Sequence, residues 1–114
     1  MKGVIEVRHH VNRAGKDLFD EWLSSLADAR AQAKVAVRID RLAAGNFGDC
    51  NTLRRGLREL RIDWGPGYRV YFAILGRDSV LLLCGGDKRS QSRDIERASH
   101  YIVDYRERTD TREA

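Results

Sequence analysis

At 114 residues and a net charge of +4, the chain has enough sequence for one modest hydrophobic core and too little for two. Hydrophobic residues make up 42% and charged residues 33%, with a single proline, which excludes disordered and collagen-like chains. No apolar run approaches the roughly 20 residues of a membrane helix, and the first residues lack the apolar segment of a secretory signal. A cytoplasmic globular protein without a membrane partner is expected.

The first half of the chain predicts a short strand followed by two helices. Apolar and charged residues alternate over 5–8, the pattern of a half-buried strand that we expect at one edge of a sheet. After Asn12, a candidate helix N-cap, apolar residues recur at helical spacing over 19–26. A second amphipathic helix is expected from about Asp28 until the glycine-containing loop at 45–49.

A β-hairpin is predicted in the middle of the chain. Apolar residues alternate with charged ones over 57–63, and a second alternation over 68–75 places Arg69 and Tyr71 on one face. Between these strands, residues 65–67 predict a tight turn, with its proline in the second position and a glycine free to take positive φ in the third.

The last part of the chain predicts one more strand and a helix. The continuous apolar run from Val80 to Cys84 is typical of an interior strand that is covered on both faces. Helical spacing then predicts a helix from about Ser90 to Arg106, and the polar residues 107–114 are expected to form a frayed tail. The order β-α-α-β-β-β-α predicts a single α+β domain over 1–106, with a small, mainly antiparallel sheet, two N-terminal helices and a C-terminal helix.

The positive charge is concentrated in one stretch of the sequence. Residues 53–97 contain ten lysines and arginines against six carboxylates, whereas the flanking segments are close to neutral. Such a concentration is typical of a face that binds a polyanion, because each neutralised phosphate releases counterions. A solvated arginine-rich surface without a ligand accounts for the composition equally well.

Four cationic residues are expected to converge: Arg61 and Arg69 on the two hairpin strands, and Lys88 and Arg89 after the last strand. Neighbouring strands lie about 4.8 Å apart, so these side chains can surround one phosphate, which guanidinium groups bind in bidentate fashion. The adjacent pair Gly85-Gly86 either allows a nucleic-acid backbone to approach closely or forms a tight turn into the last helix. As an exposed strand residue, Arg69 is expected to contribute to ligand binding more than to stability.

RNA can be cleaved at such a cluster without a metal. The ribose 2′-hydroxyl attacks the adjacent phosphorus when the charge on the phosphate oxygens is neutralised and the geometry is in line. The proton acceptor is expected among Glu59, Tyr71 and a lysine of lowered pKa. Alternatively, Glu59 pairs with an arginine, and Tyr71 stacks on a base or fills the core. No cofactor and no metal site are expected, because nucleotide-binding, zinc and hydrolase motifs are missing from the sequence.

Several motifs occur in a characteristic order: Phe19-x-x-Trp22-Leu23, Gly45–Asp49, Leu60-Arg61-Ile62, Gly65–Phe72 and Leu83–Lys88, followed by Gln91, Asp94 and Ile95. Together they resemble the addiction-module killer proteins, relatives of HigB within the RelE/ParE toxin superfamily. This resemblance implies a RelE-like fold and the toxin of a type II toxin-antitoxin system.

RelE-like toxins cleave messenger RNA, commonly on the ribosome, and so inhibit translation. By position, Arg61, Arg69 and Lys88 match their basic cluster, and we expect these three residues to be catalytic in an endoribonuclease. The residues expected to bind RNA around them are Arg58, Glu59, Tyr71, Arg89, Gln91 and Arg93. The resemblance also implies a cognate antitoxin, expected to be a helix-turn-helix protein that forms a hetero-oligomer with the toxin.

Two other functions remain open at the level of sequence. ParE-like relatives use a similar scaffold to poison DNA gyrase without cleaving RNA, and a scaffold alone does not determine function. The third alternative is a non-catalytic module that binds nucleic acid.

Overall fold

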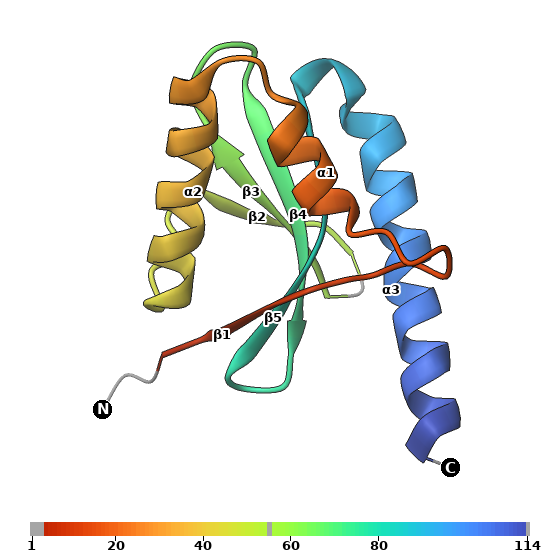
Figure 1. Cartoon of the computed structure of the whole chain (residues 1–114). Helices are drawn as coiled ribbons and strands as arrows, with labels where there is room; N and C mark the ends of the chain where they lie inside the picture. The colour runs from red at the N-terminus through yellow and green to blue at the C-terminus, as the bar shows by residue number, and fades with distance from the viewer. Residues whose placement is uncertain (1–3, 55, 114) are drawn as a thin grey trace.

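In the computed structural model, which describes residues 4–54 and 56–113, one five-stranded sheet lies between helices (Figure 1). The elements in chain order are β1 (Glu6–His9), α1 (Leu18–Ser25), α2 (Ala29–Ala43), β2 (Cys50–Thr52), β3 (Leu57–Ile62), β4 (Tyr68–Leu75), β5 (Ser79–Asp87), the short 3-10 helix η1 (Lys88–Ser90) and α3 (Gln91–Glu113). The predicted α+β class is confirmed, and the sheet contains one strand more than predicted, β2.

The strands are arranged in the order β1-β5-β4-β3-β2. All neighbours are antiparallel except β1 and β5, which pair in parallel with Glu6 opposite Ser79. The first strand therefore forms an edge, as predicted. The predicted hairpin consists of β3 and β4, in register from Leu57 opposite Ala73 to Ile62 opposite Tyr68.

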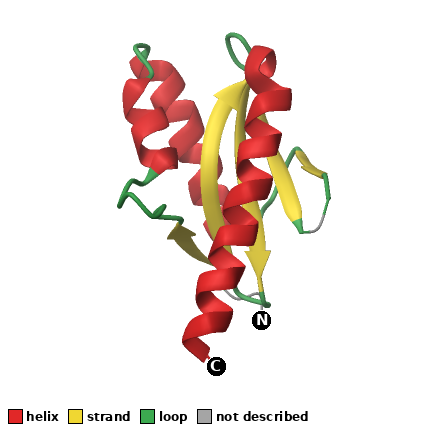
Figure 2. Ribbon diagram, turned by 90° about the vertical axis from the view of Figure 1, so that its right-hand side faces the viewer, coloured by secondary structure: helices red, strands yellow, loops and turns green. Residues whose placement is uncertain are grey.

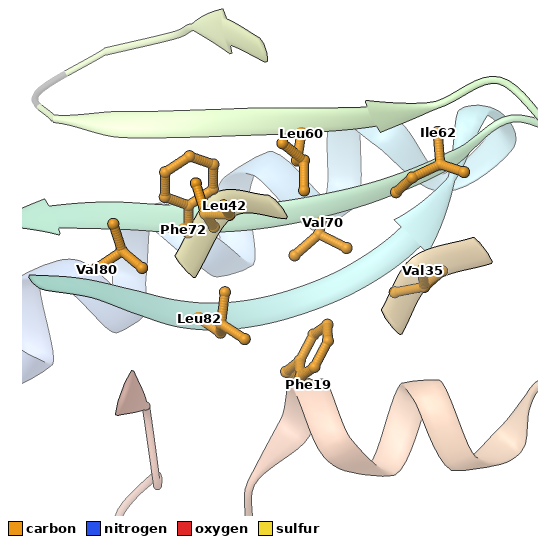
Figure 3. Packing of buried hydrophobic residues seen from close by; sticks show 9 residues of the cluster. All are labelled: Phe19, Val35, Leu42, Leu60, Ile62, Val70, Phe72, Val80 and Leu82. Carbon is orange, nitrogen blue, oxygen red and sulfur yellow. The ribbon is translucent and has the colours of Figure 1, made fainter. Parts of the chain in front are cut away.

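Helices cover both faces of the sheet (Figure 2). On one face, α1 and α2 pack their apolar stripes onto the sheet in a core that contains Phe19, Val35, Leu42, Leu60, Ile62, Val70, Phe72, Val80 and Leu82 (Figure 3). On the other face, α3 contributes Ala98 and Ile102 to a second core with Tyr71 and Leu83. β5 is buried along most of its length because it lies between these two layers, as its apolar run predicts.

The helix caps differ in part from the prediction. The side chain of Asp28 accepts a hydrogen bond from the backbone N of Arg30 (2.9 Å) and caps α2, so this helix begins where the sequence predicts. Asn12, in contrast, is not an N-cap: its Oδ1 stabilises a loop by accepting from the backbone N of Lys16 (2.9 Å). The residue that caps α1 is Asp17.

Three segment boundaries also differ from prediction. The turn between β3 and β4 is closed by a hydrogen bond from Gly67 N to Trp64 O (3.0 Å), so Pro66 is its third residue, one position later than predicted. β5 continues through Asp87, because its last residues still pair with β4. α3 continues past Arg106 to Glu113. None of the helices in the described part of the chain is both long and apolar enough to cross a membrane.

Candidate active site at the end of the central strands

The structure places the three residues expected to be catalytic around one hollow. Arg61 on β3 and Arg69 on β4 are direct cross-strand partners, so their side chains leave the same face of the sheet. Lys88 lies one residue beyond β5, in η1. Together they line a cavity of about 300 Å³, whose other walls are the 65–67 turn and the carboxylates Asp49 and Asp63.

Glu59 is a buried carboxylate that supports the two arginines. It is only 1% exposed, and it lies two residues before Arg61 on β3. Its Oε1 is 3.5 Å from Nε of Arg61, and its Oε2 is 3.9 Å from Nε of Arg69. Gln91, at the start of α3, donates a hydrogen bond from Nε2 to the same Oε2 (2.7 Å). The interpretation of Glu59 as the partner of an arginine is therefore confirmed.

Arg69 is a buried residue, contrary to the expectation of an exposed one, and its exposed fraction is 9%. α3 covers this face of the sheet, which the alternation of β4 by itself cannot predict. The Nη1 of Arg69 donates to the carbonyl of Tyr68 (3.0 Å). Gly67, in the turn beside this guanidinium group, has a φ of +82°, a backbone conformation that favours glycine.

Tyr71 belongs to the core. It is fully buried in the layer beneath α3, directly opposite Glu59 on β3. Burial, and then the neighbouring Glu59 carboxylate, raise the pKa of the phenol. In this arrangement no base can stack on Tyr71, and at neutral pH the phenol keeps its proton. Of the predicted roles for Tyr71, the core role is confirmed, and the stacking and proton-acceptor roles are wrong.

Gly85 and Gly86 are needed for packing inside the protein. A Cβ at Gly85 would lie 2.2 Å from the ring of Trp22 on α1, and one at Gly86 would lie 1.9 Å from Oδ2 of Asp94 on α3. Both residues are part of β5, and each lets a helix lie directly on the strand. Neither predicted explanation, a tight turn or the close approach of a nucleic-acid backbone, describes their place in the structure.

Hydrogen bonds at the start of α3 hold Lys88 in place. The side chain of Asp87 accepts from the backbone N of Arg89 (2.9 Å) and of Ser90 (3.3 Å), and Ser90 Oγ donates to the buried Asp94 (2.5 Å). This capping box ties η1 to the end of β5. Among the residues that the structure describes, Lys88 has no carboxylate partner, so its ammonium group is free to bind an anion.

The residues expected to bind RNA fall into separate groups. Arg89 and Arg93 line a shallow hollow of about 540 Å³ on the outside of η1, and Arg89 is paired with Asp87 at 3.4 Å. Gln91 is occupied by Glu59. Arg58 leaves β3 on the opposite face from Arg61 and interacts with Cys50, so the structure does not bring it into the site.

Asp49 and Asp63 are the members of the hollow that sequence reasoning missed. Asp63 follows Glu59 and Arg61 on the charged face of the 57–63 alternation, and this pattern could have identified it as a site residue. Asp49 is brought in by long-range pairing, because the backbone N of Arg61 donates to its carbonyl (2.9 Å) next to the short strand β2. The three residues of β2 are too few to show a strand periodicity, so neither β2 nor the position of Asp49 was predicted.

A mixed five-stranded sheet, with two helices on one face and one on the other, defines a small protein of RelE-like fold. The family described as phage-derived protein Gp49-like (DUF891) matches residues 21–102, most of the chain, and the chain belongs to this family. The family belongs to the RelE-like group of proteins that resemble addiction-module toxins. An uncharacterized protein of Haemophilus influenzae is 54% identical over 80 residues, which cover 70% of this chain and 81% of that protein.

Proposed function

We propose that the chain is the HigB-like toxin of a type II toxin-antitoxin system and that it cleaves messenger RNA without a metal. The observation that carries the proposal is the convergence of Arg61, Arg69 and Lys88 on one hollow of about 300 Å³. Three cations in one hollow suit a phosphate whose negative charge grows during the reaction. The proposed effect is inhibition of translation through loss of transcripts.

The arginines stabilise the transition state by their fixed position. Glu59 and the carbonyl of Tyr68 hold Arg69 before a ligand enters, so its guanidinium group needs little reorganisation during the reaction. Arg61, whose side chain is 40% exposed, contacts the phosphate from the solvent side of the hollow. Both groups neutralise the non-bridging oxygens.

The reaction forms a bond between the 2′-oxygen and phosphorus and breaks the bond from phosphorus to the 5′-oxygen. Of the groups that line the hollow, the carboxylates of Asp49 and Asp63 can take the proton from the 2′-hydroxyl. Lys88, an ammonium group without a carboxylate partner among the described residues, can give a proton to the departing 5′-oxygen. The products are a 2′,3′-cyclic phosphate and a free 5′-hydroxyl.

Membership of the Gp49-like family supports an antitoxin as partner, and we propose a helix-turn-helix protein that forms a hetero-oligomer with this chain. The proposed target is messenger RNA, on the ribosome or free. We propose that the antitoxin inhibits the toxin by covering the cationic hollow, because a phosphate cannot enter a covered hollow.

The test is cleavage by purified protein in the presence of a metal chelator, with free RNA and ribosome-bound messenger RNA as substrates. We expect fragments that end in a 2′,3′-cyclic phosphate, and loss of cleavage in Arg61→Ala and Lys88→Ala. Arg77→Ala, in the exposed turn at the far end of β4, is the matched control. Intact RNA together with inhibited gyrase supercoiling would support the ParE-like function instead.

A further inference from the structure

A second basic hollow lies beside α2, where the chain leaves β3. Its volume is about 610 Å³. We call it the α2 groove, and its charged and aromatic lining consists of Arg30, Lys34, Arg38, Arg41, Asp63 and Trp64. Four cations against one carboxylate make it more strongly basic than the hollow around Arg69. Figure 1 shows α2 alongside β3, and the lining residues Asp63 and Trp64 directly follow the end of this strand.

Arg38 is built into the wall of the α2 groove. Its Nη1 donates to the carbonyl of Arg61 (2.5 Å), and its Nη2 donates to the carbonyl of Phe47 (3.1 Å). These partners are neutral, so the positive charge of Arg38 is not cancelled. The same hydrogen bonds tie α2 to the backbone of β3 directly behind the side chain of Arg61.

The other cations of the α2 groove face outward. Arg30, Lys34 and Arg41 are exposed, and in the described part of the chain none of them has an ion-pair partner. The Nζ of Lys34 lies 4.7 Å from the ring centroid of the half-buried Trp64. An aromatic ring among cations that have no carboxylate partner is an arrangement with which proteins bind single-stranded nucleic acid, because bases stack on aromatic rings and phosphates pair with the cations.

The two hollows meet at the end of β3. Asp63 lines both of them, and its neighbours Ile62 and Trp64 line the α2 groove. An RNA strand held at Arg61 and Arg69 must continue past one side of the site. The α2 groove offers positive charge and a stacking surface along this path.

We propose that the α2 groove binds the single-stranded RNA that continues from the phosphate at Arg61, Arg69 and Lys88. Arg30, Lys34 and Arg41 pair with successive phosphates, and a base stacks on Trp64. This inference rests on the proposed function and adds the form of its substrate: an extended strand that passes around the end of β3.

The binding test uses labelled RNA with 2′-O-methyl riboses, which cannot be cleaved, in lengths of about 12 and about 3 nucleotides. Fluorescence anisotropy measures the affinity. We expect the double substitution Lys34→Glu, Arg41→Glu to weaken binding of the long RNA by about tenfold or more at low salt, and binding of the short RNA by less than about twofold. Arg77→Glu, a single charge reversal in the β4–β5 turn, should leave both affinities unchanged, and the single variants Lys34→Glu and Arg41→Glu, which match it in charge, should each weaken binding of the long RNA.

A second pair of variants tests the stacking role. Trp64→Ala should weaken binding of the long RNA by about fivefold or more, and Trp64→Tyr, which keeps an aromatic face, should restore most of the affinity. Circular dichroism and thermal melting of each variant separate loss of binding from loss of the fold. Equal affinities of all groove variants and the Arg77→Glu control would overturn the inference.

The remaining outcomes separate this inference from the proposed function. If wild-type protein cleaves long RNA and the groove variants have an unchanged KM, only the groove inference is overturned. If the groove variants weaken binding but the wild type cleaves no RNA, the groove binds RNA and the proposed cleavage is wrong. If polyglutamate of equal charge competes as well as RNA and Trp64→Ala has no effect, the groove is a surface for an acidic protein and the inference is overturned.

Discussion

Arg61 and Arg69 lie directly opposite each other on neighbouring strands, and the buried carboxylate of Glu59 contacts both. Like charges in facing positions destabilise a sheet. The negative charge of Glu59 offsets this repulsion. Both arginines also line the hollow, where we propose that they bind a phosphate. The pairing thus keeps two cations together before any ligand binds.

The first prediction concerns the carboxylate of Glu59. Glu59→Gln leaves the mostly buried Arg69 without its counter-charge, so we expect the free energy of unfolding to fall by about 2–4 kcal/mol. RNA cleavage should fall with it, because the arginines lose their fixed position. Urea unfolding and cleavage kinetics measure the two effects. Glu96→Gln is the control, since Glu96 and its partner Arg54 are exposed; an equal loss in both variants would contradict the supporting role.

The two arginines should differ in their effect on stability. Arg61→Ala and Arg69→Ala should both abolish cleavage. Arg69→Ala should lower the free energy of unfolding by about 1–3 kcal/mol, because it leaves the buried Glu59 with fewer partners. Arg61→Ala, at a more exposed position, should lower it by about 1 kcal/mol or less. Thermal melting of both variants checks this order. Stability of Arg69→Ala equal to wild type would mean that its burial is not energetically important.

The carboxylates of the hollow should carry the proton transfer. If Asp63 or Asp49 takes the proton of the 2′-hydroxyl, the corresponding asparagine variant should cleave about 100-fold or more slowly at saturating RNA. Full activity in both Asp63→Asn and Asp49→Asn would mean that the proton acceptor lies elsewhere.

Gly85 should tolerate no side chain while Trp22 is present. Gly85→Ala forces a methyl group against the indole ring, and we expect a loss of about 2 kcal/mol or more in the free energy of unfolding. In the double variant that also carries Trp22→Ala, the loss in free energy of unfolding should be smaller than the sum of the losses in the two single variants. Simple additivity of the two substitutions, measured by urea unfolding, would argue against the packing explanation.

His10 should make stability depend on pH. Its ring is 2% exposed and lies against Tyr101, and in the described part of the chain neither ring nitrogen has a hydrogen-bond partner. Burial, followed by the charge of Arg108, lowers the pKa of His10. The unfolded state therefore takes up a proton first as pH falls, and the folded state loses stability below about pH 6.5.

The test for His10 is the difference in unfolding free energy between about pH 7.5 and pH 5. His10→Phe keeps a ring against Tyr101 and cannot titrate, so this difference should be smaller than in wild type. His100→Gln, at an exposed position, should behave as wild type. Identical pH dependence in all three proteins would exclude the effect.

Local sequence patterns determined the elements and the hairpin. Alternation over 57–63 and 68–75 is a property of neighbouring residues, and it sufficed to place Arg69 and Tyr71 on one face and to bring Arg61 beside them. The glycines and the proline at 65–67 likewise fixed a tight turn, although not the position of the proline in it. The sequence thus predicted the fold class and the convergence of Arg61, Arg69 and Lys88. The fourth cation expected there, Arg89, lines a separate hollow.

Only the tertiary structure decided which face α3 covers, and with it the burial of Glu59, Arg69 and Tyr71. A strand's alternation separates two faces but does not say which one faces solvent, because that depends on elements distant in sequence. The same holds for Gly85, whose partner Trp22 lies far away along the chain, and for Asp49, which is placed by a strand too short to have a period. Residues meet there through long-range packing, which no local pattern records.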